Sequence, residues 1–265
     1  MKQIIHTYTA GGMTLYIKPG PDGKSIGDCP FAHFVRIVLA EKNLDYDIVP
    51  CTPDTKPNWL VEEYGGKMPA LRHRKECYVD SEVIVQYLDF FFVEPELSPR
   101  RSSSGKGKGG ADAMTVATKA VEGFFPAMAK YIKYRGGTNG DEEDMTRRSI
   151  LEERLRALED HLSDETRMSS STSTEGGGEE GSGGDCGPYI VGNGKQFTLL
   201  DCSLAPKLYA LDICLTDVKG WTADELQSKF PHVRKYMDAL FDRPSFRKTV
   251  EYGKETVVWG WTSDH

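Results

Sequence analysis

The strongest constraint on the fold of this chain is the alternation of strand-like and helix-like hydrophobic patterns in its first hundred residues. Residues 13–18 have the composition of a strand, and a loop rich in turn-forming residues separates them from Cys29. From Pro30 onward, apolar residues recur at positions 31, 34, 35, 38 and 39, which is the spacing of an amphipathic helix ending near residue 42. A helix therefore begins directly after Cys29, with proline in its first turn.

The same alternation continues to about residue 92. Strand-like segments are expected at residues 46–49, 68–74 and 77–79, and helices at residues 58–64 and 80–92. The predicted element order is strand, helix, strand, helix, strand, strand, helix. This order predicts an N-terminal α/β domain of about 80 residues.

The remainder of the chain has only helical patterns. Helices are expected at residues 114–134, 143–162, 199–215, 224–241 and 245–254, the third of them kinked by Pro206. Thr198 and Asp201 have the spacing of a capping box at the start of that third helix, with aspartate in place of glutamate. The fold class is therefore an α/β domain followed by an all-α domain.

Two tracts belong to neither domain. Glycine makes up 27 of 265 residues, about 10% against a usual ~7%. Residues 98–111 hold 4 of these glycines and residues 163–187 hold 7, so the other 226 residues have an ordinary glycine content. Such tracts bury too little apolar surface to fold. We therefore expect an α/β domain at 12–97, a flexible linker at 98–111, and a helical domain at 112–265 with a disordered insertion at about 163–187.

Charge and cysteine usage limit the partners and the compartment. The net charge of −7 argues against a nucleic acid or anionic membrane partner. The six cysteines include no CxxC pair and no secretory signal precedes them, which indicates reduced thiols and a cytoplasmic protein. The chloroplast is the alternative if a transit peptide has been removed. The longest apolar stretch, residues 83–93, is too short for a membrane span.

Cys29 is the candidate reactive residue. A cysteine at a helix N-terminus faces free backbone N–H groups and the positive end of the helix dipole, which can lower its pKa from ~8.5 into the range 3.5–7.5. None of the other cysteines precedes a predicted helix in this way. The alternative interpretation is that Cys29 is a small buried residue that caps the helix.

The element order, with Cys29 at the first helix and Pro69 before the third strand, resembles a thioredoxin-like domain, and the helical domain after it resembles the glutathione transferase superfamily. Within that superfamily the motif G-D-C-P-F at residues 27–31 resembles plant and algal dehydroascorbate reductases. The resemblance extends from about residue 13 to 261, apart from the two tracts. Further matching motifs are K-P-N-W (56–59), G-K-M-P-A-L (66–71), D-S-E-V-I-V (80–85), D-C-S-L-A-P-K-L-Y (201–209), F-P-H-V-R-K-Y-M (230–237) and the terminal G-W (260–261).

The resemblance implies reduction of dehydroascorbate to ascorbate with two molecules of glutathione and no metal. Ala32 stands where a CxxC motif would place its second cysteine, so an external thiol must resolve oxidised Cys29. A monothiol ping-pong cycle follows, in which Cys29 is the nucleophile and glutathione supplies the electrons.

The resemblance also implies a glutathione site along the α/β domain. Pro69 is expected to be cis, so that Met68 pairs with the backbone of the tripeptide. Asp80 and Ser81 open a helix and would bind the ammonium and carboxylate of the γ-glutamyl end. Lys56 would contact the glycyl carboxylate.

Four further residues complete the expected site. In the family, the positions of Lys18 and Asp28 contact both glutathione and ascorbate. Lys18 would stabilise anions, whereas Asp28 opposes a low thiol pKa and is better interpreted as a group that handles protons. Phe31 is expected to contact glutathione, and Trp261 is expected to close over the site.

Two positions depart from the family pattern. Ala210 stands where family members often have a histidine, and Asp264 stands where plant members have a lysine. Both changes concern the helical side of the cleft. We therefore expect the contacts from the α/β domain to be kept and those from the helical domain to be rewired.

Three other functions remain open from the sequence. One is an omega-class-like thioltransferase that acts on mixed disulfides. Another is a protein like the chloride intracellular channels, which insert into membranes, although His33 and Arg36 interrupt the short helix at 31–42. The third is a non-enzymatic binding module, whose thiol would need no activation. We expect a monomeric enzyme without stable membrane association, with glutathione and dehydroascorbate as its small-molecule partners.

Overall fold

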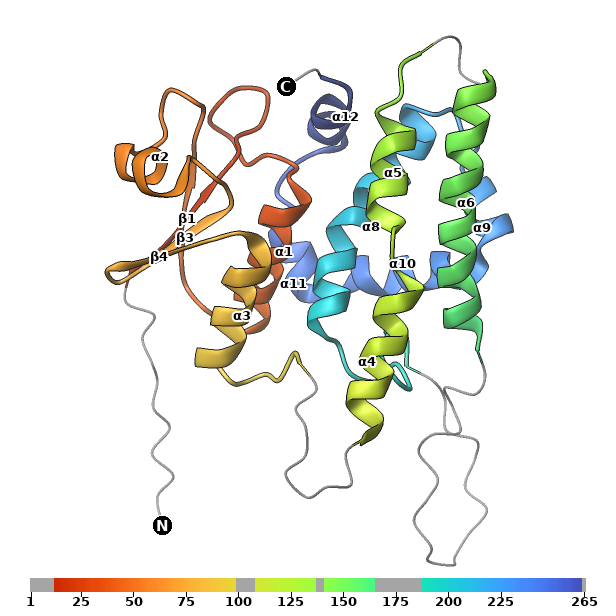
Figure 1. The fold of residues 1–265 in the computed structure, drawn as a ribbon, viewed down its shortest axis with the longest axis horizontal. Coiled ribbons are helices and arrows are strands. Elements are labelled where there is room, and N and C mark those ends of the chain that lie inside the picture. The colour runs from red at the N-terminus through yellow and green to blue at the C-terminus, as the bar shows by residue number, and fades with distance from the viewer. Residues whose placement is uncertain (1–11, 99–107, 137–140, 165–186, 264–265) are drawn as a thin grey trace, which may run out of the picture.

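A four-stranded mixed sheet forms the core of the N-terminal part of the chain (Figure 1). The computed structural model describes residues 12–98, 108–136, 141–164 and 187–263. The strands are β1 (Met13–Ile17), β2 (Asp47–Pro50), β3 (Ala70–His73) and β4 (Glu76–Val79), arranged in the order β2-β1-β3-β4. Strand β1 pairs parallel to β2 and antiparallel to β3, and β3 pairs antiparallel to β4. This arrangement confirms the α/β domain expected from the sequence.

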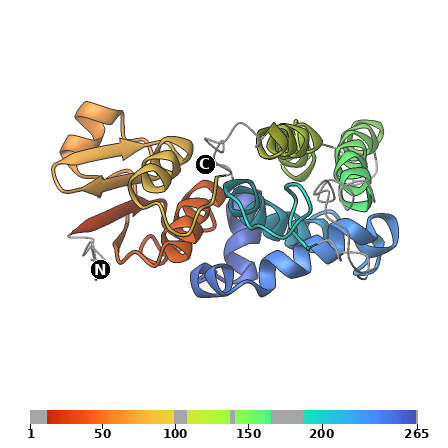
Figure 2. The same ribbon diagram turned by 90° about the horizontal axis from the view of Figure 1, so that it is seen from below.

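Three helices accompany this sheet. They are α1 (Pro30–Glu41), α2 (Asn58–Tyr64) and α3 (Ser81–Phe91). Helices α1 and α3 pack against each other between the sheet and the helical part of the chain, while α2 lies on the far side of the sheet (Figures 1 and 2). All seven elements predicted for the first hundred residues are present, within three residues of their expected ends.

The helical part packs against α1. It contains α4 (Lys108–Ala120), α5 (Phe124–Ile132), α6 (Glu142–Ser163), α8 (Leu199–Asp217), α9 (Glu225–Lys229), α10 (Pro231–Asp242), α11 (Pro244–Thr249) and α12 (Lys254–Thr262). Helix α8 runs through its centre, contacting α1, α5, α10 and α12. The capping box at Thr198 and Asp201 is present at the start of α8, as predicted.

Several predicted helix boundaries are wrong. The helix expected at 114–134 is two helices, because Gly123 adopts a left-handed conformation between them. The helix expected at 224–241 divides at Phe230, where the backbone leaves the helical region before Pro231. The helix expected at 245–254 ends at Thr249, and the separate helix α12 was not predicted. Helix α4 begins at Lys108, inside the range expected for the linker.

The two Gly/Ser tracts lie largely outside the described residues. Residues 99–107 belong to the tract at 98–111, and residues 165–186 belong to the tract at 163–187. The linker and the insertion therefore remain predictions over those residues.

No helix in the described ranges combines the length and apolar character that crossing a membrane requires.

Helix α1 is largely buried between the sheet and the helical part. Nine of its twelve residues are buried. Its polar side chains bind the C-terminal segment: His33 forms hydrogen bonds with Tyr252 at 2.7 Å and with Thr249 at 2.9 Å, and the Arg36 guanidinium forms an ion pair with Glu251. Burial, and then the nearby Arg36 charge, hold the pKa of His33 well below its ordinary value, so the ring is neutral. The position of α1 is thus fixed from both the sheet and the helical part.

Asp201 joins three segments of the helical part. Its buried carboxylate accepts hydrogen bonds from the Thr198 N–H (2.8 Å) and hydroxyl (2.7 Å), the Ile190 N–H (3.1 Å) and the Tyr236 hydroxyl (2.9 Å). A buried carboxylate is tolerated because these four donors compensate its lost hydration. This side chain therefore holds the start of α8, the segment before it and α10 together.

We expect Asp201→Ala to lower the free energy of unfolding by about 3 kcal/mol or more, because it leaves buried donors without an acceptor. Chemical denaturation followed by circular dichroism measures this change. Asp238→Ala is the matched control, since Asp238 is an exposed carboxylate that pairs with Arg234 on α10, and its loss should lower stability by less than about 1 kcal/mol. Equal effects of the two substitutions would contradict the assigned role of Asp201.

Candidate active site

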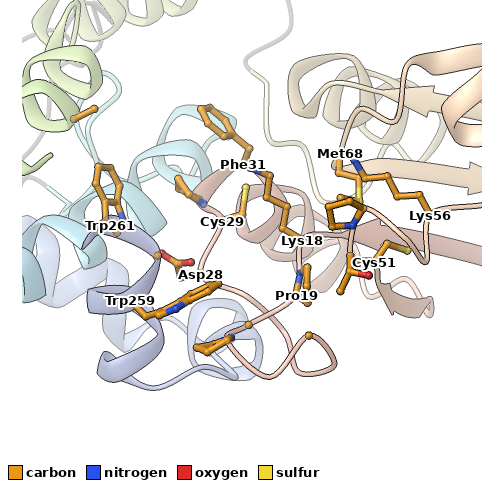
Figure 3. Close-up of a pocket in the computed structure, with 18 of the residues that line it drawn as sticks. Lys18, Pro19, Asp28, Cys29, Phe31, Cys51, Lys56, Met68, Trp259 and Trp261 are labelled. Atoms are coloured by element: carbon orange, nitrogen blue, oxygen red, sulfur yellow. The ribbon is translucent and has the colours of Figure 1, made fainter. Parts of the chain in front are cut away.

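A cavity of about 620 Å³ opens between the α/β part and the helical part (Figure 3). This volume falls within the usual range of ~300–1,000 Å³ for small-molecule sites. Its lining comes from the β1–α1 loop, the loop after β2, helix α5 and helix α12. The lining residues are Lys18, Pro19, Gly20, Pro21, Gly23, Asp28, Cys29, Pro30, Phe31, Cys51, Thr52, Pro53, Lys56, Met68, Phe125, Ala129, Lys133, Trp259, Gly260 and Trp261.

The loop between β1 and α1 brings Lys18 close to Asp28 and Cys29. The loop folds back on itself through a bridge between Pro19 and Ile26. Gly27 makes the close approach feasible, because a Cβ there would lie 2.8 Å from the carbonyl oxygen of Lys18. Residues ten apart in the sequence thereby meet at one side of the cavity. This is the structural role of the loop that the sequence analysis placed before Cys29 and described as rich in turn-forming residues.

Cys29 is half-buried and occupies the N-cap position of α1. Burial raises the pKa of its thiol, and the negative charge of Asp28 acts in the same direction. The backbone N–H groups of Ala32 and Phe31 and the Lys18 ammonium lower the pKa but do not outweigh burial. The low thiol pKa expected from the helix N-terminus is therefore wrong for this ligand-free structure, because desolvation exceeds the helix effect. Cys29 rests as a thiol and needs a base to ionise.

Asp28 has the properties of such a base. Burial raises the pKa of its carboxyl from 3.8 to about 6, although a hydrogen bond from its own backbone N–H and the charges of Lys18 and Lys133 lower it. A carboxyl with a pKa near 6 is ionised at neutral pH and accepts a proton more readily than an ordinary aspartate. This observation agrees with the proton-handling role expected for Asp28.

The part of the cavity that faces the sheet includes Lys56 and Met68, two of the residues expected to bind glutathione. The Met68–Pro69 peptide bond is cis, which confirms that expectation. The Lys56 side chain lies over Gly66, so its ammonium is held near the cavity. Both residues come from loops that precede secondary-structure elements of the α/β part.

Pro69, Asp80 and Ser81 are not among the residues that line the cavity in the described structure. The β3–β4 register pairs Ala70 with Val79, so Pro69 and Asp80 flank the same end of the sheet, next to Met68. Asp80 caps α3 by accepting a hydrogen bond from the Glu82 N–H at 3.0 Å, and Ser81 is buried. Asp80 also has a φ of 77°, an uncommon value for aspartate that often marks functional positions.

Aromatic side chains line the side of the cavity that faces the helical part. Phe31 and Phe125 pack edge to face with ring centroids 5.3 Å apart, and Phe125 contacts Trp261 at 6.1 Å. The Trp261 side chain is buried and faces the cavity, as Figure 3 shows. Phe31 and Trp261, both expected to contribute to the glutathione site, thus line the cavity.

Lys133 was missed by the sequence analysis. Phe125, Ala129 and Lys133 are spaced by four residues and line the cavity from one face of α5. The Lys133 ammonium lies 5.7 Å from the centroid of the Trp261 ring. The four-residue spacing could have identified these residues as one face of a helix. The sequence, however, predicted a single long helix at 114–134 and did not indicate which of its faces lines the cavity.

The structure describes one of the two positions at which the sequence departs from the family pattern. Ala210 is buried within α8 and presents no polar group. Asp264 lies outside the described residues. Lys133, Trp259 and Trp261 provide the cation and the aromatic rings that line the helical side of the cavity.

Five cysteines in the described part of the chain are not joined in disulfides: Cys29, Cys51, Cys77, Cys202 and Cys214. Cys51 also lines the cavity, but its side chain is almost fully buried and burial raises its pKa. Cys29 is the more exposed of these two thiols, which supports its choice as the reactive one.

These residues together suit redox chemistry on a small anionic or enolisable substrate. A thiol (Cys29), a carboxyl with a raised pKa (Asp28) and two ammonium groups lie around one cavity, where the Lys18 charge acts on both Cys29 and Asp28 and the Lys133 charge acts on Asp28. Positive groups at fixed positions stabilise negative charge that develops during a reaction.

Two family models match the chain. Residues 25–96 match the glutathione S-transferase N-terminal domain, and residues 117–239 match the glutathione S-transferase C-terminal domain. The first range covers the α/β part from α1 onward but not β1, and the second covers most of the helical part.

Curated relatives and solved structures agree with this result. The chain is 31% identical over 239 residues to glutathione S-transferase DHAR2 of Arabidopsis thaliana, which covers 90% of this chain and 91% of the relative. It is 30% identical to a probable cytosolic DHAR1 of Oryza sativa, covering 89% and 90% of the two chains. The crystal structure of Chlamydomonas reinhardtii dehydroascorbate reductase is similar with a TM-score of 0.66 and 29% identity, covering 94% of this chain and 96% of that one.

We expect the rate at which iodoacetamide alkylates Cys29 in the ligand-free protein to rise with pH, with a midpoint above the pKa of an ordinary thiol. Lys18→Ala should raise this midpoint further, because the Lys18 charge favours the thiolate. Mass spectrometry of the Cys29 peptide across a pH series measures the rate. Lys24→Ala is the matched control, since Lys24 is exposed in the same loop but does not line the cavity. A wild-type midpoint below neutral pH would contradict this description.

Proposed function

The chain belongs to the glutathione S-transferase family, and on that basis we propose that it reduces dehydroascorbate to ascorbate with glutathione as the electron donor. The observation that carries the proposal is the position of Cys29 at the start of α1, facing a cavity that also contains Asp28, Lys18 and Lys133. The similarity to proteins named DHAR, spread over about 90% of the chain, supports the same substrate.

Glutathione fits the side of the cavity that faces the sheet. It carries two carboxylates and one ammonium, so its ends require groups of opposite charge. Lys56 would bind the glycyl carboxylate, and the backbone of Met68, ahead of the cis Pro69, would pair with the cysteinyl residue. The γ-glutamyl end would extend past Met68 to Asp80 and Ser81, where α3 offers free N–H groups at its N-terminus. This placement brings the glutathione thiol near Cys29.

The first step oxidises Cys29 and reduces the substrate. The Asp28 carboxylate takes the thiol proton, and the Cys29 thiolate attacks dehydroascorbate. With one molecule of water, the products are a sulfenic acid on Cys29 and ascorbate, so two electrons pass from sulfur to the substrate. Ascorbate leaves as an anion, and Lys18 and Lys133 stabilise the charge as it develops.

Two molecules of glutathione then restore the thiol. The first condenses with the sulfenic acid, which releases water and leaves glutathione joined to Cys29 through a disulfide bond. The thiolate of the second attacks the glutathione sulfur of that bond and leaves as glutathione disulfide, while Cys29 recovers its proton. The net reaction consumes one dehydroascorbate and two glutathiones. No second protein thiol is required, in keeping with Ala32 at the CxxC position.

We expect Cys29→Ser to reduce kcat/KM for dehydroascorbate by about three orders of magnitude or more, because a serine hydroxyl is neither ionised nor oxidised under these conditions. The assay follows ascorbate formation by its ultraviolet absorbance in the presence of glutathione. Cys77→Ser is the control, since Cys77 is a half-buried thiol on β4 that does not line the cavity. Retention of most activity in Cys29→Ser would exclude the mechanism.

The same assay distinguishes an omega-class-like thioltransferase. The wild-type enzyme is expected to prefer dehydroascorbate over hydroxyethyl disulfide in kcat/KM, because Lys18 and Lys133 favour a substrate that becomes anionic. A higher kcat/KM for the disulfide would identify the thioltransferase instead.

A further inference from the structure

The carboxylate of Asp28 lies directly against the backbone of α12 at Gly260. A Cβ atom at position 260 would lie 2.6 Å from Asp28 Cγ and closer still to both carboxylate oxygens. Contacts this short do not occur between real atoms, so no residue with a side chain is compatible with this position of Asp28. Figure 3 shows the Asp28 carboxylate on the α12 side of the cavity, close to Trp259 and Trp261.

The conformation of α12 does not itself explain this glycine. Gly260 is inside the helix and is absent from the glycines with positive φ, so any residue could adopt its backbone angles. Glycine is among the least favourable residues in a helix interior. The close approach of Asp28 is therefore the structural reason for glycine at this position.

The groups that face Asp28 come from several elements. Lys18 follows β1 and Lys133 follows α5, and their charges lower the pKa of the Asp28 carboxyl. Cys29 is its neighbour in the sequence. Cys214 on α8 and Tyr252, which precedes α12, also interact with the Asp28 charge. Burial, and secondarily this charge, raises the pKa of the Cys214 thiol to about 12. The same two causes raise the pKa of the Tyr252 hydroxyl well above its ordinary value.

We propose that Gly260 is a positioning residue: its missing side chain creates the space on α12 in which the Asp28 carboxylate is shielded from water and held ready to accept the proton of Cys29. Trp259 and Trp261 line the cavity on either side of this position and exclude solvent. The two lysines alone would give a carboxyl with a low pKa and hence a weak base. Burial of the carboxylate, which lies against α12 at Gly260, outweighs their effect and raises its pKa to about 6. The catalytic part of this inference rests on the function proposed above.

Gly260→Ala tests the inference directly. The added methyl group would displace the carboxylate into the open cavity, where water and the two lysines stabilise its charge. We expect the titration midpoint of the Asp28 carboxyl to fall from about 6 toward the ordinary value of about 3.9. Carbon-13 NMR of carboxyl-labelled aspartate follows this titration, and the Asp28 signal is assigned by its loss in Asp28→Asn. An unchanged midpoint in a folded Gly260→Ala protein would overturn the proposal.

Gly253→Ala is the matched control. Gly253 precedes the same helix, has a φ of −81°, and a Cβ there would meet the end of the flexible Glu255 side chain. It does not line the cavity. We expect this substitution to leave the Asp28 midpoint and kcat/KM unchanged.

A double-mutant cycle keeps the inference testable if Gly260→Ala is poorly folded. In the wild-type background, the methyl group of Gly260→Ala collides with Asp28, so the cost of moving that side chain should make the change in Tm less favourable than it is in a protein without Asp28. In an Asp28→Ala background the collision is absent, so the same substitution should leave the Tm unchanged or raise it. Equal changes of Tm in both backgrounds would show that Gly260 does not act through Asp28.

The activity readout separates this inference from the proposed function. With glutathione and dehydroascorbate, Gly260→Ala should lower kcat/KM at neutral pH by roughly tenfold or more, and the acid limb of the pH profile should move to lower pH. If wild-type protein does not reduce dehydroascorbate, the proposed function fails, whereas the NMR and Tm results still decide the role of Gly260. If wild-type protein is active but those results are negative, only the role of Gly260 fails.

Discussion

The burial of helix α1 between the sheet and the helical part is the constraint on which the rest of the site depends. Its apolar residues pack on both sides, and His33 and Arg36 bind the segment around Thr249, Glu251 and Tyr252. These contacts hold the helix, with Cys29 at its N-terminus, against both parts. The cavity at that N-terminus is therefore shaped jointly by the two parts, although the thiol belongs to only one of them.

The same enclosure explains why the thiol is not ionised at rest. A helix N-terminus stabilises a thiolate, but the packing that fixes Cys29 also removes water from it, and desolvation has the larger effect here. In the proposed mechanism the helical part offsets this effect through α12, whose Gly260 leaves the space that the Asp28 carboxylate occupies. Proton transfer from Cys29 to Asp28 thus depends on residues more than a hundred positions away in the sequence.

Local patterns in the sequence predicted much of this structure. Hydrophobic spacing located every element around the sheet, the capping box at Thr198 and Asp201 located the start of α8, and motif resemblance identified Cys29, Lys18 and the cis Pro69. Two kinds of structural feature could not be predicted from the sequence. Breaks at Gly123 and Phe230 depend on single backbone conformations, and the contributions of Lys133 and Gly260 depend on which helix faces pack against the β1–α1 loop. Spacing along one helix does not reveal such contacts.

The central claim is that Cys29 passes electrons from glutathione to dehydroascorbate. Peptide mass spectrometry after one turnover tests it most directly: the protein is mixed with dehydroascorbate and a single equivalent of glutathione, quenched with acid and digested. We expect glutathione to be joined by a disulfide bond to the peptide that contains Cys29, and this adduct to form only when dehydroascorbate is present. Glutathione attached to Cys51 or another cysteine instead, or ascorbate formed with no adduct on Cys29, would contradict it.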